Sequence, residues 1–262
     1  MGRVRTRPRV VIRLVGLALL LCAALTGSAP VQADAAVAVD LELVLAVDAS
    51  RSVDAEEAHL QRQGYIAALT DPRVVKAIQS GTTGRIAVLY FEWASEFYQR
   101  IVVDWTVISD EASARAVADA LAVAPYRSER RTSISGAIRF ASGLFGQSYR
   151  GERRVIDISG DGRNNAGPPI ETARAEALAR DITINGLPIL NDKPKFNGFG
   201  GYGLDPHLDR YYQESVVGGP GSFVIPADDF QSFDRAILSK LIREVAAAPI
   251  DGRQLAASAP TD

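Results

Sequence analysis

The sequence predicts an α/β fold with a doubly wound, mostly parallel central sheet, helices on both faces of the sheet and one antiparallel edge strand. Short continuous apolar runs, typical of strands buried on both faces, alternate with segments of helical periodicity. The length of 262 residues corresponds to about one to two domains, and no internal repeat is present. A content of 47% hydrophobic and 23% charged residues excludes a disordered or fibrous chain.

The elements of the first half follow in the order strand, helix, strand, edge strand, helix. Residues 43–47 are a continuous apolar strand. Asp54 and Glu57 have the spacing of a capping box, which begins a helix over residues 55–69 that the pair Asp71-Pro72 stops. The remaining predictions for this half are a strand at 85–91, a short edge strand at 100–103 and a helix at 110–123.

The second half continues the alternation of helices and strands. Two apolar stripes at helical spacing mark a middle helix and a closing helix, at Ile134, Ile138, Ala141 and Phe145 and at Phe230, Phe233, Ile237 and Leu241. Between these stripes we expect a strand at 154–158, a helix at 169–180 with Pro in its first turn, a strand at 182–189 and a last strand at 223–225.

Residues 191–221 interrupt the alternation and form an insertion in the domain predicted over residues 41–247. About thirty residues is too long for a plain connection. If the strand at 182–189 runs parallel to the first strand, the insertion leaves from the sheet edge where ligands bind in open α/β folds. Its aromatic residues form either a partner-binding surface or a satellite core; they are Phe196, Phe199, Tyr202, Tyr211 and Tyr212. Residues 248–262 are predicted to be a flexible tail.

The first 33 residues have the composition of an export signal, with basic residues before an apolar stretch at 14–25 and small residues after it. We therefore predict a signal peptide over residues 1–33 and a periplasmic or secreted mature protein. Residues 1–33 contain five Arg and no acidic residue, so their removal leaves 24 basic and 31 acidic residues and changes the net charge from −2 to −7. This charge argues against nucleic acid or an anionic membrane as the main partner.

Two alternatives for this N-terminal segment concern anchoring. An uncleaved membrane anchor is disfavoured because Arg13 interrupts the run and residues 14–25 are too short to span a bilayer comfortably, so no transmembrane span is expected in the mature chain. Cys22 is a candidate lipidation site, but Leu21 precedes it where a small residue is wanted. Because Cys22 is the only cysteine, the predicted mature protein has neither disulfides nor cysteine metal sites.

The segment Asp48-Ala49-Ser50-Arg51-Ser52 stands where the first buried strand ends and the first helix begins. Its alternate residues, Asp48, Ser50 and Ser52, carry a carboxylate and two hydroxyls. Oxygen donors presented by one tight loop suit a hard cation such as Mg²⁺. The alternative is that these residues only begin the helix, since Ser and Asp are both favoured as N-caps.

Two later segments offer matching oxygen donors at equivalent positions. Thr132 stands at the start of a helix, and Asp161 stands in the turn after a strand. With these three motifs and its order of elements, the sequence over residues 41–245 resembles the von Willebrand factor type A (vWA) family. In that family a metal-ion-dependent adhesion site (MIDAS) joins an Asp-x-Ser-x-Ser loop to a distant Thr and a distant Asp.

The resemblance implies a role for each of these five residues. Ser50, Ser52 and Thr132 would bind the metal, Mg²⁺ or else Mn²⁺ or Ca²⁺, through their hydroxyls. Asp48 and Asp161 would bind it directly or through water. An open coordination position would accept an Asp or Glu carboxylate from a protein partner, which implies recognition through a shared cation without bond breaking.

The sequence departs from the family pattern at two places. The pair Arg130-Arg131 precedes Thr132 where many members have two glycines, so Ser133 remains an alternative ligand, although the spacing to the following helix favours Thr132. Gly160 precedes the second acidic ligand where Thr is frequent. The turn at 159–165 resembles an uncharacterised group of bacterial exported proteins within this superfamily.

Other polar residues have two interpretations each. His59, inside the first helix, fits a surface or interface residue better than a ligand. His207 has carboxylates beside it that would allow a second metal site, and a solvated loop explains it equally well. Asp157, in an apolar strand, either supports the metal site from behind or hydrogen-bonds to backbone. A basic cluster beside Thr132 either steers an acidic partner or is a solvated loop; it consists of Arg127, Arg130 and Arg131.

These observations favour a non-enzymatic, metal-dependent binding module that recognises an acidic group on another protein. The first alternative is a Mg²⁺-dependent hydrolase resembling a phosphatase, since a carboxylate at a strand end with Mg²⁺ also describes such enzymes. A phosphoaspartate phosphatase, however, needs a second Asp where this chain has Ser50, and with two His few acid–base schemes are open. The second alternative is a structural scaffold whose site takes no cation.

Overall fold

The computed structural model describes residue 2 and residues 36–190, 195–196, 202–203 and 205–246. The chain divides into two units, Met1–Ala35 and Ala36–Asp262, and the second is described here. The predicted signal peptide, apart from Gly2, and the predicted tail therefore lie outside the described residues and stay predictions. Among the described residues, no helix has the length and apolar character that crossing a membrane requires.

A five-stranded sheet with strand order β3-β2-β1-β4-β5 forms the centre of the second unit. Strand β1 pairs in parallel with β2 and β4, β4 pairs in parallel with β5, and β3 is antiparallel to β2 at the edge. The predicted fold class is confirmed. The strands are β1 (Val37–Asp48), β2 (Ile86–Trp93), β3 (Gln99–Ile108), β4 (Tyr149–Gly160) and β5 (Ile182–Pro188).

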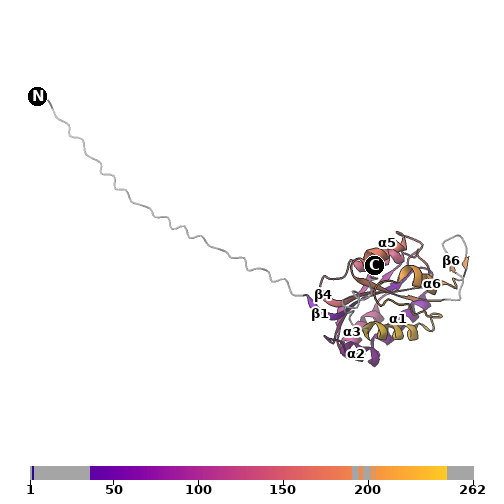
Figure 1. Ribbon diagram of the computed structural model, residues 1–262, viewed down its shortest axis with the longest axis horizontal. Coiled ribbons are helices and arrows are strands. Elements are labelled where there is room, and N and C mark those ends of the chain that lie inside the picture. Colours follow the sequence, from indigo (N-terminus) through magenta and orange to yellow (C-terminus); the bar gives the residue numbers. More distant parts are fainter. Residues whose placement is uncertain (1, 3–35, 191–194, 197–201, 204, 247–262) are drawn as a thin grey trace, which may run out of the picture. The chain divides into compact units, whose positions relative to one another are not determined.

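Helices cover both faces of this sheet because the side chains of its strands alternate between two cores. Leu43 and Leu45 of β1 belong to one core, and Val44 and Ala46 to the other. In Figure 1, α1, α2 and α3 lie on one side of the sheet and α5 on the other. The first core is covered by α1 (Ala55–Leu69), α2 (Pro72–Gln79), α3 (Glu111–Val123) and α7 (Phe233–Ala246), the second by α4 (Ile134–Ser142) and α5 (Ile170–Leu178).

Helix α2 was not predicted, because Asp71-Pro72 was interpreted only as a stop. Helix α1 does end there, with Thr70 as its C-cap. The Asp71 side chain, however, accepts a hydrogen bond of 2.8 Å from the Arg73 N–H, and Pro72 is the first residue of a new helix. Proline has no N–H, and a helix does not need one at its first position, so the same dipeptide ends one helix and begins the next.

The predicted strand at 223–225 is wrong. The segment makes one isolated bridge to β5, between Gly186 and Val224, and a second isolated bridge, between Ile189 and Ala227, follows just beyond both. Pro226 follows the predicted strand and has no N–H to donate to a ladder, which limits the pairing.

The insertion contains short elements in its described parts. They are β6 (Lys195–Phe196), β7 (Tyr202–Gly203), α6 (Leu208–Tyr211) and the π-helix η1 (Tyr212–Val216). Tyr212 is completely buried in the second core and Tyr211 packs against that core, so these two rings join the core of the sheet itself and do not form a separate satellite core. Phe199 lies outside the described residues, and only the backbone is described at Phe196 and Tyr202.

Candidate metal site

The loop after β1 is held at the carboxyl edge of the sheet by backbone hydrogen bonds from two other segments. The Ala49 N–H donates to the Trp93 carbonyl at 2.8 Å, which fixes the loop against the end of β2. The Arg51 N–H donates to the Glu129 carbonyl at 3.0 Å, and the Glu129 N–H donates back to Ala49 at 3.2 Å. These bonds place the loop that precedes Thr132 beside the loop that begins at Asp48.

Four of the five predicted ligands form a connected polar chain. The Ser50 N–H donates to Asp48 Oδ1 at 2.7 Å. The hydroxyl oxygens of Ser50 and Ser52 lie 2.8 Å apart, and the Ser52 hydroxyl donates to Asp161 Oδ1 at 2.7 Å. Asp161 comes from the turn after β4, so residues distant in sequence meet at one edge, as the parallel strands require.

Thr132 lies against the same turn. Its N–H donates to Asn165 Oδ1 at 2.9 Å, and its carbonyl accepts from the Asn165 N–H at 2.8 Å. A Cβ added to Gly162 would lie 3.9 Å from the Thr132 hydroxyl oxygen, so this hydroxyl is next to the residue that follows Asp161. Four of the five predicted ligands are therefore in contact and Thr132 lies beside the turn that carries Asp161, and the assignment of metal ligands stays a prediction.

Ser133, the alternative to Thr132, has a different structural role. Its hydroxyl accepts a hydrogen bond of 3.1 Å from the Gly136 N–H as the N-cap of α4, and donates to the Ala166 carbonyl at 3.0 Å. A hydroxyl used as a cap is tied to the helix end. The geometry therefore favours Thr132 over Ser133 as the ligand.

Arg131 adopts a backbone conformation that a glycine would adopt without strain. Its φ is 77°, in the left-handed region, which disfavours a side chain by about 1–2 kcal/mol. Arg131 is the second residue of the pair that replaces two glycines of the family pattern. A left-handed residue therefore stands directly before Thr132, and strained residues of this kind cluster at functional sites.

The basic cluster beside the site is exposed. Arg127, Arg130 and Arg131 are all exposed, as is Arg51 between the two serine ligands. In the part of the chain that the structure describes, none of these four guanidinium groups forms an ion pair with a carboxylate. Exposed positive charge therefore borders the site on a chain of negative net charge.

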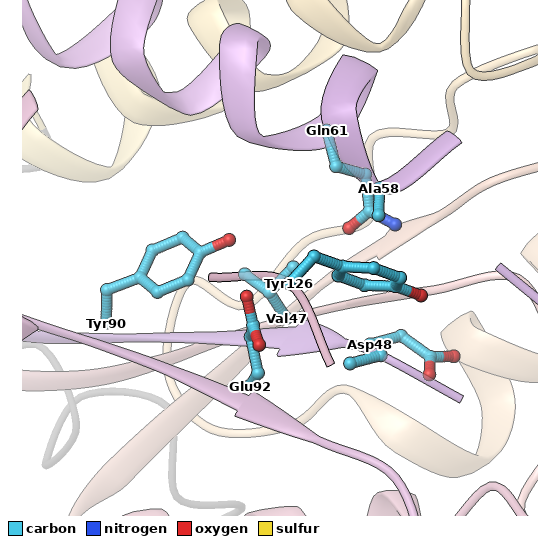
Figure 2. Close-up of a pocket in the computed structure, with 8 residues that line it drawn as sticks. Val47, Asp48, Ala58, Gln61, Tyr90, Glu92 and Tyr126 are labelled. Carbon is cyan, nitrogen blue, oxygen red and sulfur yellow. The ribbon is translucent and has the colours of Figure 1, made fainter. Parts of the chain in front are cut away.

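A small cavity lies behind Asp48, on the side of α1. Figure 2 shows the Gln61 amide reaching from α1 toward Tyr126, above the end of β1. Gln61 is 1% exposed, and neither of its amide atoms has a hydrogen-bond partner among the described residues. With a volume of about 10 Å³, the cavity has room for one water molecule and is too small for an organic substrate.

Asp157 belongs to a buried charge cluster rather than to the metal site. Its carboxylate lies 2.7 Å from Lys240 Nζ, which also lies 2.5 Å from Glu244 Oε1. Burial, reinforced by the negative charge of Glu244, raises the pKa of Asp157 to about 7. Both sequence interpretations of Asp157 are therefore corrected, because its side chain forms an ion pair with a lysine that is distant in the sequence.

The two histidines lie outside the site. His59 is exposed on α1, as expected for a surface residue. Asp205, beside His207, is paired with Arg163 at 2.5 Å. Among the described residues, no group of three or more His, Cys, Asp or Glu side chains is placed to hold a metal. The five-residue site contains only two carboxylates, and its other three donors are hydroxyls, so it does not count as a group of this kind.

Sequence reasoning assigned no role to Asn165 or Gln61. Asn165 is a fixed partner of Thr132 on both its N–H and its carbonyl. The pair Asn164-Asn165 after the Asp-Gly turn was a local signal for such bonds, because Asn side chains readily hydrogen-bond to nearby backbone. No local signal marks Gln61, whose polar surroundings arise only from tertiary packing.

Comparisons with known proteins identify a family to which the sequence belongs and solved structures that share its fold. The protein-family model described as "Protein of unknown function (DUF1194)" matches residues 38–249. No functionally curated protein matches the sequence significantly. Solved structures do match, at identities that establish likeness of fold alone.

Three of these structures illustrate the likeness. BatB, a conserved hypothetical protein from Bacteroides thetaiotaomicron, is 20% identical with a TM-score of 0.52, over 79% of this chain and 100% of that one. The pilus adhesin SpaC from Lactobacillus rhamnosus GG is 13% identical with a TM-score of 0.57, and the match covers 79% of this chain and 30% of SpaC. Proximal thread matrix protein 1 from the mussel byssus, with a zinc-occupied MIDAS motif, is 14% identical with a TM-score of 0.53. The match covers 80% of this chain and 49% of the mussel protein. The vWA-like fold is thereby confirmed.

Proposed function

This chain belongs to the family described as "Protein of unknown function (DUF1194)", and we propose that it is an exported binding module that holds a divalent cation and uses it to bind an acidic group on a protein partner. The observation that carries the proposal is the meeting of oxygen donors from three separate loops. Ser50, Ser52 and Asp161 are joined by contacts of 2.7 and 2.8 Å, with Asp48 and Thr132 beside them.

The donor set fits a hard cation. It consists of two carboxylates and three hydroxyls and contains no sulfur or imidazole ligand, which favours Mg²⁺, or Mn²⁺ or Ca²⁺, over softer metals. Asp48 and Asp161 would neutralise the charge of a divalent ion, and Ser50, Ser52 and Thr132 would hold it through neutral oxygens. A cation held in this way still attracts a further carboxylate, which the partner would supply.

The exposed arginines support an acidic partner. Arg51, Arg127, Arg130 and Arg131 border the donor set without carboxylate partners of their own among the described residues. Positive charge around a binding site accelerates encounter with a negatively charged partner and makes the association rate sensitive to salt. The SpaC and mussel matrix proteins are an adhesin and a matrix component, and a binding role here is consistent with theirs.

No observation favours the hydrolase alternative. The hydroxyls of Ser50 and Ser52 contact each other and Asp161, and neither is next to a histidine that would activate it as a nucleophile. A role in recognition therefore explains the donor set more directly than bond breaking does.

Export and domain limits complete the proposal. We propose that residues 1–33 are removed on export, that the protein acts in the periplasm or beyond, and that the binding module spans residues 41–247 with the insertion at 191–221. N-terminal sequencing of the protein recovered outside the cytoplasm checks the first point. An N-terminus at Asp34 is expected, and recovery of the intact N-terminus would contradict cleavage.

Calorimetric titration with Mg²⁺ and Mn²⁺ tests the metal site. The protein is purified after export of the full chain and treated with a chelator. Saturable binding is expected for the wild type and for Asp119→Ala, a control at an exposed residue of α3. Asp48→Ala and Thr132→Ala should each abolish it with the circular dichroism spectrum unchanged. Wild-type protein that shows neither heat nor thermal stabilisation at millimolar cation would contradict the proposal.

A peptide assay tests partner recognition separately. Surface-bound protein is exposed to a library of short peptides with one Asp or Glu and to the matching Asn and Gln peptides, with Mg²⁺ or with chelator. Selective binding of carboxylate peptides in Mg²⁺ alone supports the proposal. Equal binding of acid and amide peptides would contradict recognition through the cation.

A further inference from the structure

Two glycines on neighbouring strands leave space that is filled by the ring of Tyr212. Gly186 of β5 pairs with Ile158 of β4, and Gly160 lies two residues further along β4. Because side chains two residues apart in a strand share a face, positions 160 and 186 lie on the same face of the sheet. A Cβ added to Gly186 would lie 2.8 Å from Tyr212 Cδ1, and one added to Gly160 would lie 2.9 Å from the Tyr212 hydroxyl oxygen. Real Cβ atoms essentially never come this close, so the ring occupies space that side chains at 160 and 186 would need.

The Tyr212 hydroxyl reaches the metal site. The same point, the place of a Cβ on Gly160, is 2.9 Å from the hydroxyl oxygen and 3.0 Å from Asp48 Oδ2. Tyr212 is 0% exposed, and its hydroxyl has no hydrogen-bond partner among the described residues. A buried hydroxyl left without a partner costs about 1–3 kcal/mol, so its position beside a predicted metal ligand calls for a function.

The hydroxyl is a proton donor at all physiological pH values. The ordinary pKa of a tyrosine hydroxyl is about 10, so the phenol is neutral in this pH range. A neutral phenol beside a carboxylate donates its proton to a hydrogen bond and does not compete for the cation as an anion would.

The segment that carries Tyr212 is also bound to the turn that carries Asp161. The Arg163 guanidinium pairs with Asp205 at 2.5 Å and lies over the Tyr211 ring, 4.8 Å from its centre. The Asn164 N–H donates to the Tyr211 hydroxyl at 3.3 Å. Residues 205–212 therefore approach the site at two points. Asp205 and Tyr211 contact the turn after β4, and Tyr212 lies next to Gly160.

We propose that Tyr212 is a positioning residue of the metal site, whose hydroxyl donates to the Asp48 carboxylate through one water, across the space that Gly160 leaves open. This inference rests on the proposed metal site and gives the part of the insertion that carries Tyr212 a defined role, which is to set the cation affinity.

Tyr212→Phe tests the inference, because it removes the hydroxyl and keeps the ring in place. The matched control is Tyr65→Phe. Tyr65 is also completely buried, and its hydroxyl donates to Ser159 Oγ at 3.2 Å, in the other core. Removing a residue that orients a metal ligand typically weakens metal affinity by about 10–100-fold. We expect a Mn²⁺ Kd raised by about 10-fold in Tyr212→Phe, with the metal-free melting temperature kept, and an unchanged Kd in Tyr65→Phe.

The outcomes separate the inference from the function on which it rests. If the wild type binds Mn²⁺ and Tyr212→Phe binds it equally well, the inference is overturned and the metal site stands. If the wild type binds no cation, the proposed function fails and the inference fails with it. A Kd that rises equally in both Phe variants would show a general effect of lost hydroxyls and would also overturn the inference.

A measurement without metal tests whether the hydroxyl and residue 160 compete for the same space. Gly160→Ala is made in the wild type and in Tyr212→Phe, and all four proteins are unfolded thermally in chelator. Because the added methyl meets the hydroxyl oxygen at 2.9 Å, Gly160→Ala should lower the melting temperature more in the wild type than in Tyr212→Phe. Equal losses in both backgrounds would overturn the placement of the hydroxyl beside Gly160.

Discussion

Replacing Lys240 by methionine perturbs the buried charge cluster between α7 and the sheet. Lys240 Nζ lies 2.7 Å from Asp157 Oδ1 and 2.5 Å from Glu244 Oε1, and all three side chains are at most 1% exposed. Methionine keeps most of the apolar stem and leaves both carboxylates buried without their cation. Removing one partner of a buried ion pair costs about 3–5 kcal/mol.

The structure places the expected loss at the lower end of this range. Glu244 Oε1 keeps a hydrogen bond of 3.0 Å from Asn185 Nδ2, and burial already holds the pKa of Asp157 at about 7, so this carboxyl can bind a proton near neutral pH. We expect Lys240→Met to lose about 3 kcal/mol of unfolding free energy. At about 2–4 °C per kcal/mol, the melting temperature should fall by roughly 6–12 °C.

Urea unfolding followed by circular dichroism at pH 7.5 measures the loss. Lys76→Met is the control, because Lys76 is exposed on α2 and its replacement should change stability by less than about 0.5 kcal/mol. A triple variant with Asp157→Asn, Lys240→Met and Glu244→Gln should recover most of the loss, since it leaves no unpaired charge. A Lys240→Met variant as stable as the control, or a triple variant as unstable as Lys240→Met, would refute the reasoning.

Three further predictions concern Asp157, Arg131 and the pair Thr132-Ser133. Because burial raises the folded-state pKa of Asp157 from 3.8 to about 7, its contribution to stability is complete below about pH 4 and is lost as the pH rises through 7. Wild-type stability should therefore fall relative to Asp157→Asn between pH 4 and pH 7 in urea titrations, and parallel profiles would contradict this. Arg131→Gly should relieve the left-handed strain, raise stability by about 1 kcal/mol and keep cation binding, while it slows association with a carboxylate peptide at low salt; unchanged association would argue against steering. Ser133→Ala should lose about 1 kcal/mol with the N-cap of α4 and keep cation affinity, whereas Thr132→Ala should lose the affinity; the opposite pattern, seen by calorimetry and thermal unfolding, would make Ser133 the ligand.

The predictable parts of the site are those that depend on local sequence patterns. Asp48 ends a continuous apolar strand, and Asp161 follows another, so the parallel pairing of β1 with β4 brings both to one edge. The capping box at Asp54 and Glu57 is present as predicted and fixes the start of α1. The period-two alternation of β1 likewise determines which side chains enter each core.

The parts that were not predictable depend on contacts between distant segments. In the sequence Asp157 is an acidic residue in an apolar strand without an evident partner, because its partner Lys240 belongs to the distant helix α7. Tyr212 reads as one aromatic residue among several in a glycine-rich stretch, and only the sheet shows that Gly160 and Gly186 make room for it. No local pattern of residue types encodes such pairs.

Diffraction from crystals grown with Mn²⁺ tests the central claim most directly, because the anomalous signal of the metal locates it without reference to any function. One strong peak is expected at the carboxyl edge of β1, within coordination distance of the Ser50, Ser52 and Thr132 hydroxyls. The peak should be absent in Asp48→Ala crystals grown in the same way. A wild-type map without a peak among these hydroxyls at saturating Mn²⁺, or with its peak elsewhere, would contradict the account.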